Sequence, residues 1–204
     1  MNKLGGAAFI ASGLLFLLRA ILDFTAGAPP TNGVEILAWV ASHKLVVSLD
    51  SEILFFAAVS LVPAVIALYY SLAGVDRAKA TLGCGVMAVT IPVLAATLVM
   101  HGRLVYPIYG IRADTPDVAA LVLALFYGGM HAIYLLLAGA TFVLSLVMRV
   151  EPYGRPVAYL GFATAAAQIA ASYPDAIGPS WMLVTQVFLA AWFCAVGWKL
   201  KDLL

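Results

Sequence analysis

Residues 53–73 read ILFFAAVSLVPAVIALYYSLA, and this stretch decides the fold. It is 21 residues long and contains no charged side chain. A helix needs about 20 mostly apolar residues to cross the hydrocarbon core of a bilayer. The stretch therefore predicts a transmembrane helix, in which Pro63 is tolerated because neighbouring helices can satisfy the carbonyl that it leaves free.

Five further apolar runs are bounded by charges, prolines or glycines. Together the six runs predict spans at about 4–24, 53–73, 81–100, 121–148, 157–173 and 181–198. The fourth run is longer than one crossing needs and contains Gly128 and Gly129, so this helix is expected to tilt, to kink or to begin outside the core. We predict an all-α, polytopic bundle of six spanning helices, forming a single transmembrane domain over residues 1–204.

The composition agrees with a membrane protein. Hydrophobic residues make up 64% of the chain, charged residues only 10%, and the mean hydropathy is +1.04, which is too apolar for a water-facing surface. The net charge of +1 lacks the basic footprint of a nucleic-acid-binding protein. We expect membrane lipids and a small-molecule ligand as partners, no nucleic acid, and leave an oligomer open.

Two segments near the N-terminus allow alternative interpretations. The first apolar run resembles a signal peptide, but it is longer than such a segment and contains Arg19 and Asp23, which favours a retained helix. Between the first two spans, residues 34–47 show helical spacing of apolar side chains. They predict either a short amphipathic helix at the membrane interface or an extension of the second span.

Lysine and arginine in the connections predict the orientation, because cytoplasmic loops are enriched in these residues. With the N-terminus inside, seven lie on the inner side: Lys3, Arg77, Lys79, Arg149, Arg155, Lys199 and Lys201. Three lie outside: Lys44, Arg103 and Arg112. We therefore predict that both termini are cytoplasmic.

Polar side chains gather toward the extracytoplasmic ends of the predicted spans. Charges at membrane depth cost a few kcal/mol unless they pair or line a wet cavity. We therefore predict a polar pocket near that face. The candidate ligand-binding residues are Arg19, Asp50, Glu52, His101, Arg103, Tyr106, His131, Tyr134, Gln168 and Gln186.

Several of these residues also have structural interpretations. Arg19 can pair with Asp23 four residues later on one helix face, and Asp50 can be a helix cap. Glu52 directly precedes an apolar run and is expected to need a partner. The arginine and tyrosine pair Arg103 and Tyr106 could hold an anionic headgroup or could belong to an aromatic interface belt.

His101 and His131 raise the question of a metal or haem. With a carboxylate such as Glu52 or Asp50 they could hold zinc and activate a water molecule, and on neighbouring helices they could be axial haem ligands. Hydrogen bonding or proton relay is the third interpretation. No established metal-binding or haem-binding motif contains them, so the sequence requires no cofactor.

Three short motifs give the chain a resemblance to a known group. They are Lys3-Leu4-Gly5-Gly6, Met130-His131-Ala132-Ile133-Tyr134, and residues 153–161, which read YGRPVAYLG. With the six-span pattern, they resemble the domain of unknown function 4386 family of bacterial and archaeal membrane proteins. The resemblance implies a multi-pass protein of the prokaryotic cell membrane with cytoplasmic ends, and no activity.

The leading functional hypothesis is a membrane protein that binds a small amphipathic or anionic ligand, lipid-like or a metabolite, near the extracytoplasmic face. Transport and sensing both remain open. The alternatives are a metal-dependent intramembrane enzyme that uses His101, His131 and Glu52, a haem-binding protein, and an accessory structural subunit.

Overall fold

The computed structural model describes residues 1–150 and 152–203, and seven helices form nearly all of this part of the chain. The prediction of an all-helical bundle is confirmed. In chain order the helices are α1 (Asn2–Ala26), α2 (Gly33–Ser42), α3 (Lys44–Leu72), α4 (Arg77–Gly102), α5 (Pro116–Val147), α6 (Arg155–Ala171) and α7 (Pro174–Asp202).

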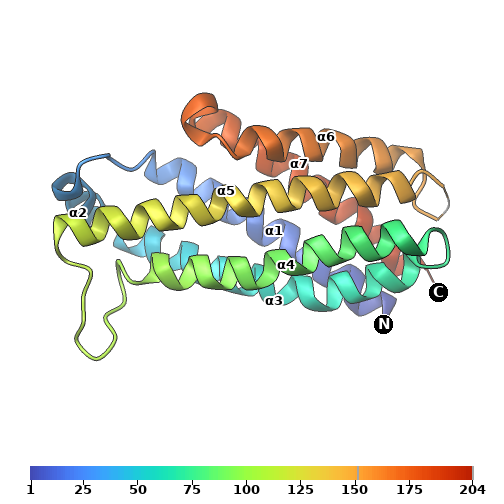
Figure 1. Cartoon of the computed structure of the whole chain (residues 1–204), viewed down its shortest axis with the longest axis horizontal. Coiled ribbons are helices and arrows are strands. Elements are labelled where there is room, and N and C mark those ends of the chain that lie inside the picture. The colour runs from blue at the N-terminus through green and yellow to red at the C-terminus, as the bar shows by residue number, and fades with distance from the viewer. Residues whose placement is uncertain (151, 204) are drawn as a thin grey trace.

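Six of these helices form a ring around one apolar core. Each packs on two neighbours, in the order α1, α3, α4, α5, α6, α7 and back to α1. The two termini lie at one end of the ring, and α2 lies at the other, against α5 and α3 (Figure 1). A small apolar cluster of Ile36, Val40, Ala119 and Leu123 fixes α2 to α5. The termini also touch, since Asn2 Nδ2 donates a hydrogen bond of 2.7 Å to the Leu203 carbonyl.

Small residues allow α1 and α7 to pack backbone against backbone. A Cβ atom added at Gly6 would lie 2.4 Å from the Gly197 carbonyl oxygen, and one added at Gly197 would lie 2.5 Å from that of Gly6. Further along the same pair of helices, the rings of Phe9 and Phe193 meet edge to face with centroids 5.2 Å apart. Glycine is thus required at the contact because any side chain would separate the two helices.

Within residues 1–150 and 152–203, five helices are long and apolar enough to cross a membrane: α1, α3, α4, α5 and α7. The chain therefore has the features of a multi-pass membrane protein. The fifth predicted span, 157–173, corresponds to α6, which has only 17 residues. At 1.5 Å per residue α6 is about 25 Å long, somewhat shorter than a hydrocarbon core of about 30 Å. Gly154, with φ of 85°, and Pro174 bound it on either side.

The segment between the first two spans combines both predicted arrangements. Its first part is a separate helix, α2, which Asn32 caps by accepting a hydrogen bond of 2.9 Å from the Val34 amide. The helix stops at His43, whose φ of −111° and ψ of 24° are not helical. From Lys44 onward the chain belongs to α3, so the second span begins nine residues before the predicted residue 53.

Two other helices differ from their predicted bounds. The helix α5 begins at Pro116 rather than at residue 121 and runs without interruption through Gly128 and Gly129. The helix α7 contains a non-helical residue, Gly178, with φ of 74°, followed by Pro179. The predicted span at 181–198 therefore matches the part of α7 that follows this break.

Candidate functional site

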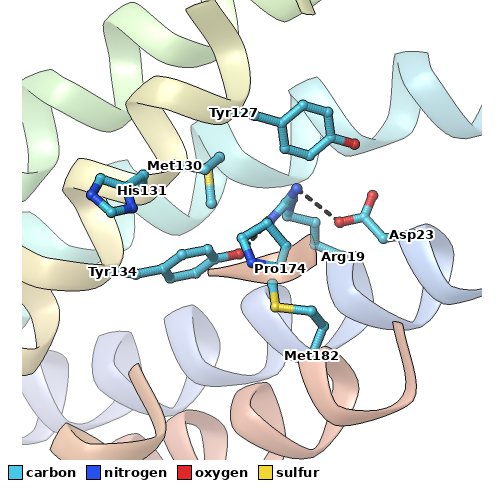
Figure 2. Close-up of a pocket in the computed structure, with 8 residues that line it drawn as sticks. All are labelled: Arg19, Asp23, Tyr127, Met130, His131, Tyr134, Pro174 and Met182. Atoms are coloured by element: carbon cyan, nitrogen blue, oxygen red, sulfur yellow. Dashed lines mark hydrogen bonds and ion pairs between the residues drawn. The ribbon is translucent and has the colours of Figure 1, made fainter. Parts of the chain in front are cut away.

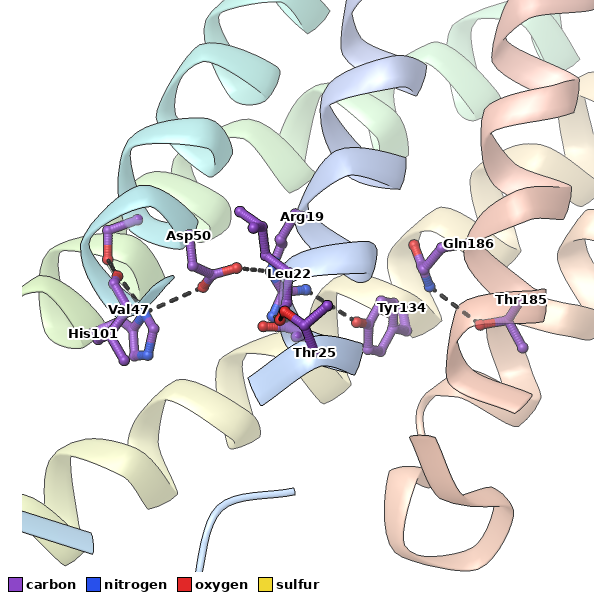
Figure 3. Close-up of polar contacts among 11 residues, drawn as sticks. Arg19, Leu22, Thr25, Val47, Asp50, His101, Tyr134, Thr185 and Gln186 are labelled. Atoms are coloured by element: carbon purple, nitrogen blue, oxygen red, sulfur yellow. Dashed lines mark hydrogen bonds and ion pairs between the residues drawn. The ribbon is translucent and has the colours of Figure 1, made fainter. Parts of the chain in front are cut away.

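A buried ion-pair network around Arg19 is the most polar feature of the bundle. The Arg19 side chain is only 5% exposed, and its Nε lies 2.6 Å from Oδ1 of Asp50 on α3. Its Nη2 lies 2.8 Å from Oδ2 of Asp23, and its Nη1 donates to the Tyr134 hydroxyl at 3.4 Å. Figure 3 shows Arg19 between Asp50 and Tyr134. The guanidinium thus links α1, α3 and α5.

Helical periodicity directs these groups toward one another. Arg19 and Asp23 are four residues apart on α1, so they share a face. On α3, Val47, Asp50 and Leu54 are buried at spacings of three and four residues, which places Asp50 on the face that packs in the bundle. An ionised group so deeply buried requires such a partner, because an unpaired charge there costs several kcal/mol.

His101, on the last turn of α4, extends the network. Its Nδ1 lies 3.2 Å from Oδ2 of Asp50 and 3.2 Å from the Ser51 hydroxyl. Its ring stacks on Phe126 with centroids 3.9 Å apart and an interplanar angle of 16°. The Arg19 Cζ lies 5.6 Å from the centroid of the same phenyl ring. The Phe126 ring therefore lies against both basic groups.

One oxygen in this network is incompletely paired. Oδ2 of Asp50 has no hydrogen-bond donor among residues 1–150 and 152–203, although His101 Nδ1 is near. The His101 nitrogen is within ion-pair distance but instead forms its hydrogen bond with Ser51. A buried carboxylate oxygen without a donor retains the capacity to accept one.

A cavity of about 510 Å³ opens beside the network, at the end of the bundle that carries α2. Its wall comes from α1, residues 26–31, α2, α3, α4, α5 and α7. Most of the wall is apolar, and the polar groups of the network lie on one side of it. A volume of this size is typical of a small-molecule site, which combines apolar walls with a few polar groups. The lining includes Arg19, Asp23, Phe24, Trp39, Asp50, His101, Tyr127, Tyr134, Asp175, Met182 and Gln186.

A smaller pocket of about 40 Å³ adjoins this cavity and shares Arg19, Asp23, Tyr127 and Tyr134 with it. Figure 2 shows the Tyr127 and Tyr134 rings on either side of the Arg19 and Asp23 pair. His131 lies on the far side of Tyr134 in this view. The volume is enough for a few water molecules and too small for an organic ligand.

The structure brings half of the predicted ligand-binding residues to the cavity wall. Arg19, Asp50, His101, Tyr134 and Gln186 line it. They come from five different helices, so the packing of these helices brings the polar side chains together at one end of the bundle.

Glu52 does not belong to this group, and none of residues 1–150 and 152–203 provides the partner that its position predicts. Its side chain is exposed, and it forms no ion pair with any described residue. The reason is helix phase: residues two apart point to nearly opposite sides of a helix, so Asp50 turns inward and Glu52 outward. The buried carboxylate of α3 is therefore Asp50, which is not a helix cap because α3 begins six residues earlier.

The other four candidates lie outside the larger cavity. The His131 Nδ1 lies 2.6 Å from the Ser172 carbonyl, and this histidine lines only the small pocket. Gln168 joins α6 to α7 by donating from Nε2 to the Thr185 carbonyl at 3.3 Å. The remaining two, Arg103 and Tyr106, lie in the segment that follows α4, away from the cavity wall.

The proposed metal ligands His101, His131 and Glu52 do not converge. His101 faces Asp50 and Ser51, His131 faces the Ser172 carbonyl, and Glu52 points away from the bundle. In the described part of the chain, no three side chains of the metal-binding types lie close enough to share an ion. The geometry of these three residues therefore does not form the predicted zinc site.

Sequence reasoning missed several residues of the cavity wall. The sequence predicts Asp23 only as the partner of Arg19, and Tyr127 and Asp175 are not among the predicted site residues. Asp23 could have been found, because it shares a helix face with Arg19. Asp175 and Trp39 could not, because only the packing of α2 and the start of α7 brings them to the cavity.

No protein-family model matches the chain, and no curated protein or solved structure is significantly similar to it. The resemblance to the domain of unknown function 4386 family stays a prediction from the sequence.

Proposed function

We propose that the protein crosses the cell membrane six times, with both termini in the cytoplasm. Five membrane-length helices support this, and α6 completes the ring between α5 and α7. An even number of crossings also agrees with the two termini lying at the same end (Figure 1). The excess of lysine and arginine at that end supports a cytoplasmic position for it.

We propose that the function is to bind a small amphipathic molecule in the cavity next to α2, near the extracytoplasmic face. The observation that carries the proposal is a cavity of about 510 Å³ that combines a mostly apolar wall with the buried pair of Arg19 and Asp50. The apolar body of a ligand would replace water along the wall, and its polar group would face the network. Transport and sensing both begin with this binding step.

The geometry favours the amphipathic ligand over the anionic one. The guanidinium of Arg19 is engaged by Asp50 at 2.6 Å and by Asp23 at 2.8 Å. An anion would have to displace one of these carboxylates to reach it. The second basic residue considered for anion binding, Arg103, does not line the cavity.

A fluorescence titration tests this proposal. The purified protein in phosphatidylcholine nanodiscs would be titrated with N-phenylnaphthylamine, a neutral amphipathic dye whose emission rises in apolar surroundings. Ala124→Trp would take up part of the cavity and narrow it, because Ala124 lines it. Ala88→Trp is the matched control, since Ala88 is exposed on α4 and outside the cavity.

We expect saturable binding to the wild type and to the Ala88→Trp variant, and a loss of affinity of at least about tenfold in the Ala124→Trp variant. Equal titrations for all three proteins, or a signal equal to that of empty nanodiscs, would contradict the proposal.

A further inference from the structure

The charges on the cavity wall are unbalanced. The wall carries one arginine, Arg19, and three carboxylates, those of Asp23, Asp50 and Asp175. No other lysine or arginine lines the wall within the described ranges. Counting the arginine and the aspartates, the formal charge of the wall is therefore +1 − 3 = −2.

The one arginine cannot neutralise the wall by itself. Its Nε and Nη2 are already within 2.8 Å of two carboxylates, so its single positive charge is shared between them before Asp175 is counted. Oδ2 of Asp50 accepts no hydrogen bond from residues 1–150 and 152–203, although His101 Nδ1 lies 3.2 Å away, and this side chain is only 1% exposed. A positive charge in the cavity would be stabilised beside Asp50, which is buried, and beside Asp23, which is 46% exposed. Asp175 is exposed and adds less.

Aromatic side chains line the same cavity. Phe24, Trp39 and Tyr127 line the cavity from α1, α2 and α5. The face of an aromatic ring attracts a cation within about 6 Å, and the attraction grows when water is excluded. An inorganic ion would use the carboxylates but not these rings or the apolar wall. A cation that carries apolar groups would use all three.

We propose that the ligand of this cavity is a lipophilic organic cation. The inference rests on the proposed function and names the charge class of its ligand. The cation lies against the side of the wall that carries Asp23 and Asp50, with its apolar groups against the rings and the aliphatic lining.

Two probes of nearly the same shape and opposite charge test the inference. Tetraphenylphosphonium and tetraphenylborate would be equilibrated with the protein in phosphatidylcholine nanodiscs, and empty nanodiscs would give the lipid partition to subtract. We expect tetraphenylphosphonium to bind saturably and tetraphenylborate to show no protein-dependent binding. The Ala124→Trp variant should abolish the phosphonium signal, which ties the signal to the cavity.

Charge variants test the role of the carboxylates. Asp50→Asn and Asp23→Asn should each weaken phosphonium binding by roughly tenfold, the effect of one unit charge a few ångströms away at an intermediate dielectric. Asp23→Asn keeps the test usable if the Asp50 variant folds poorly, because Asp23 is 46% exposed. Glu52→Gln is the matched control: it removes one carboxylate from α3 on the side away from the cavity, and it should leave binding unchanged.

Three outcomes overturn the inference. Tetraphenylborate could bind saturably while tetraphenylphosphonium does not; phosphonium binding could be the same in the two aspartate variants as in the Glu52→Gln control; or neither probe could bind. In each case the titration with the neutral dye decides separately whether the cavity binds an amphipathic molecule, so the two proposals can fail independently.

Discussion

Replacing Arg19 with methionine should destabilise the bundle more than the loss of one contact suggests. The substitution leaves Asp50, which is 1% exposed, without the cation 2.6 Å from its Oδ1. Removing one partner of a buried ion pair costs about 3–5 kcal/mol, since the remaining charge stays buried. Asp23 adds little to this cost because it is 46% exposed and can be solvated. For a chain of this size the change corresponds to a fall in Tm of about 6–20 °C.

A double-mutant cycle separates the buried charge from general packing damage. Asp50→Leu alone should cost less than Arg19→Met, because Asp23 still pairs with Arg19 at 2.8 Å. The double variant, Arg19→Met with Asp50→Leu, removes both charges together and should be several kcal/mol more stable than the sum of the two single effects predicts.

The assay is equilibrium unfolding of the four proteins in mixed micelles, followed by far-ultraviolet circular dichroism. Glu52→Leu is the control for removing a carboxylate from α3, and its exposed side chain predicts a change within about 0.5 kcal/mol. Single variants within about 1 kcal/mol of the wild type, or effects that simply add in the double variant, would refute the reasoning that Arg19 and Asp50 form a coupled buried pair.

The remaining predictions concern the end of the bundle that carries the termini. Gly6→Leu should lower the Tm sharply and weaken the packing of α1 on α7, because even a Cβ there would meet the Gly197 carbonyl oxygen at 2.4 Å. Tyr153→Phe removes the 2.7 Å hydrogen bond to the Ser71 hydroxyl and should cost about 1 kcal/mol in the same assay. Asp76 caps α4 by accepting from the Lys79 amide at 3.0 Å, and the Lys79 contacts hold its pKa below the usual 3.8, so its stabilising effect should be lost at acidic pH.

Each of these predictions has its own check. Gly139→Leu is the control for Gly6→Leu, since nothing lies within 4 Å of a Cβ at Gly139. Tyr153→Phe should leave the dye titration unchanged, and a lost titration would contradict the separation of this contact from the cavity. For Asp76, the difference in Tm between wild type and Asp76→Ala should be full near neutral pH. It should shrink as the pH falls through the lowered pKa, and a difference that grows there would contradict the sign of the shift.

The apolar runs predicted the helices well because each run must bury its backbone polar groups in its own hydrogen bonds. They predicted the start of α3 poorly. Asp50 and Glu52 interrupt the apolar run, so the sequence suggested a boundary at residue 53, whereas the helix continues back to Lys44. Charged residues end a hydrophobic pattern without ending a helix, particularly where one is paired across the bundle as Asp50 is with Arg19.

The sequence predicted polar side chains of the candidate site but not the cavity that they line. The depth of Arg19, Asp50 and His101 along their helices brought them to one end of the bundle, as the sequence indicated. The sequence could have singled out Asp50 rather than Glu52 as the buried carboxylate of α3, because Val47, Asp50 and Leu54 are spaced along one helix face. The cavity itself was not predictable, since its volume depends on how α2 and the proline-containing segment after α1 pack against the other helices.

A crystal structure with bromododecanol, a neutral amphipathic molecule with a heavy atom, tests the central claim most directly. The account predicts an anomalous bromine peak inside the cavity, between α1, α2 and α5, with the hydroxyl group on the side of Arg19 and Asp50. The Ala124→Trp variant should lack the peak. Bromine density only on the outer, lipid-facing surfaces of the helices, or the same density in the variant, would contradict the claim that this cavity is the binding site.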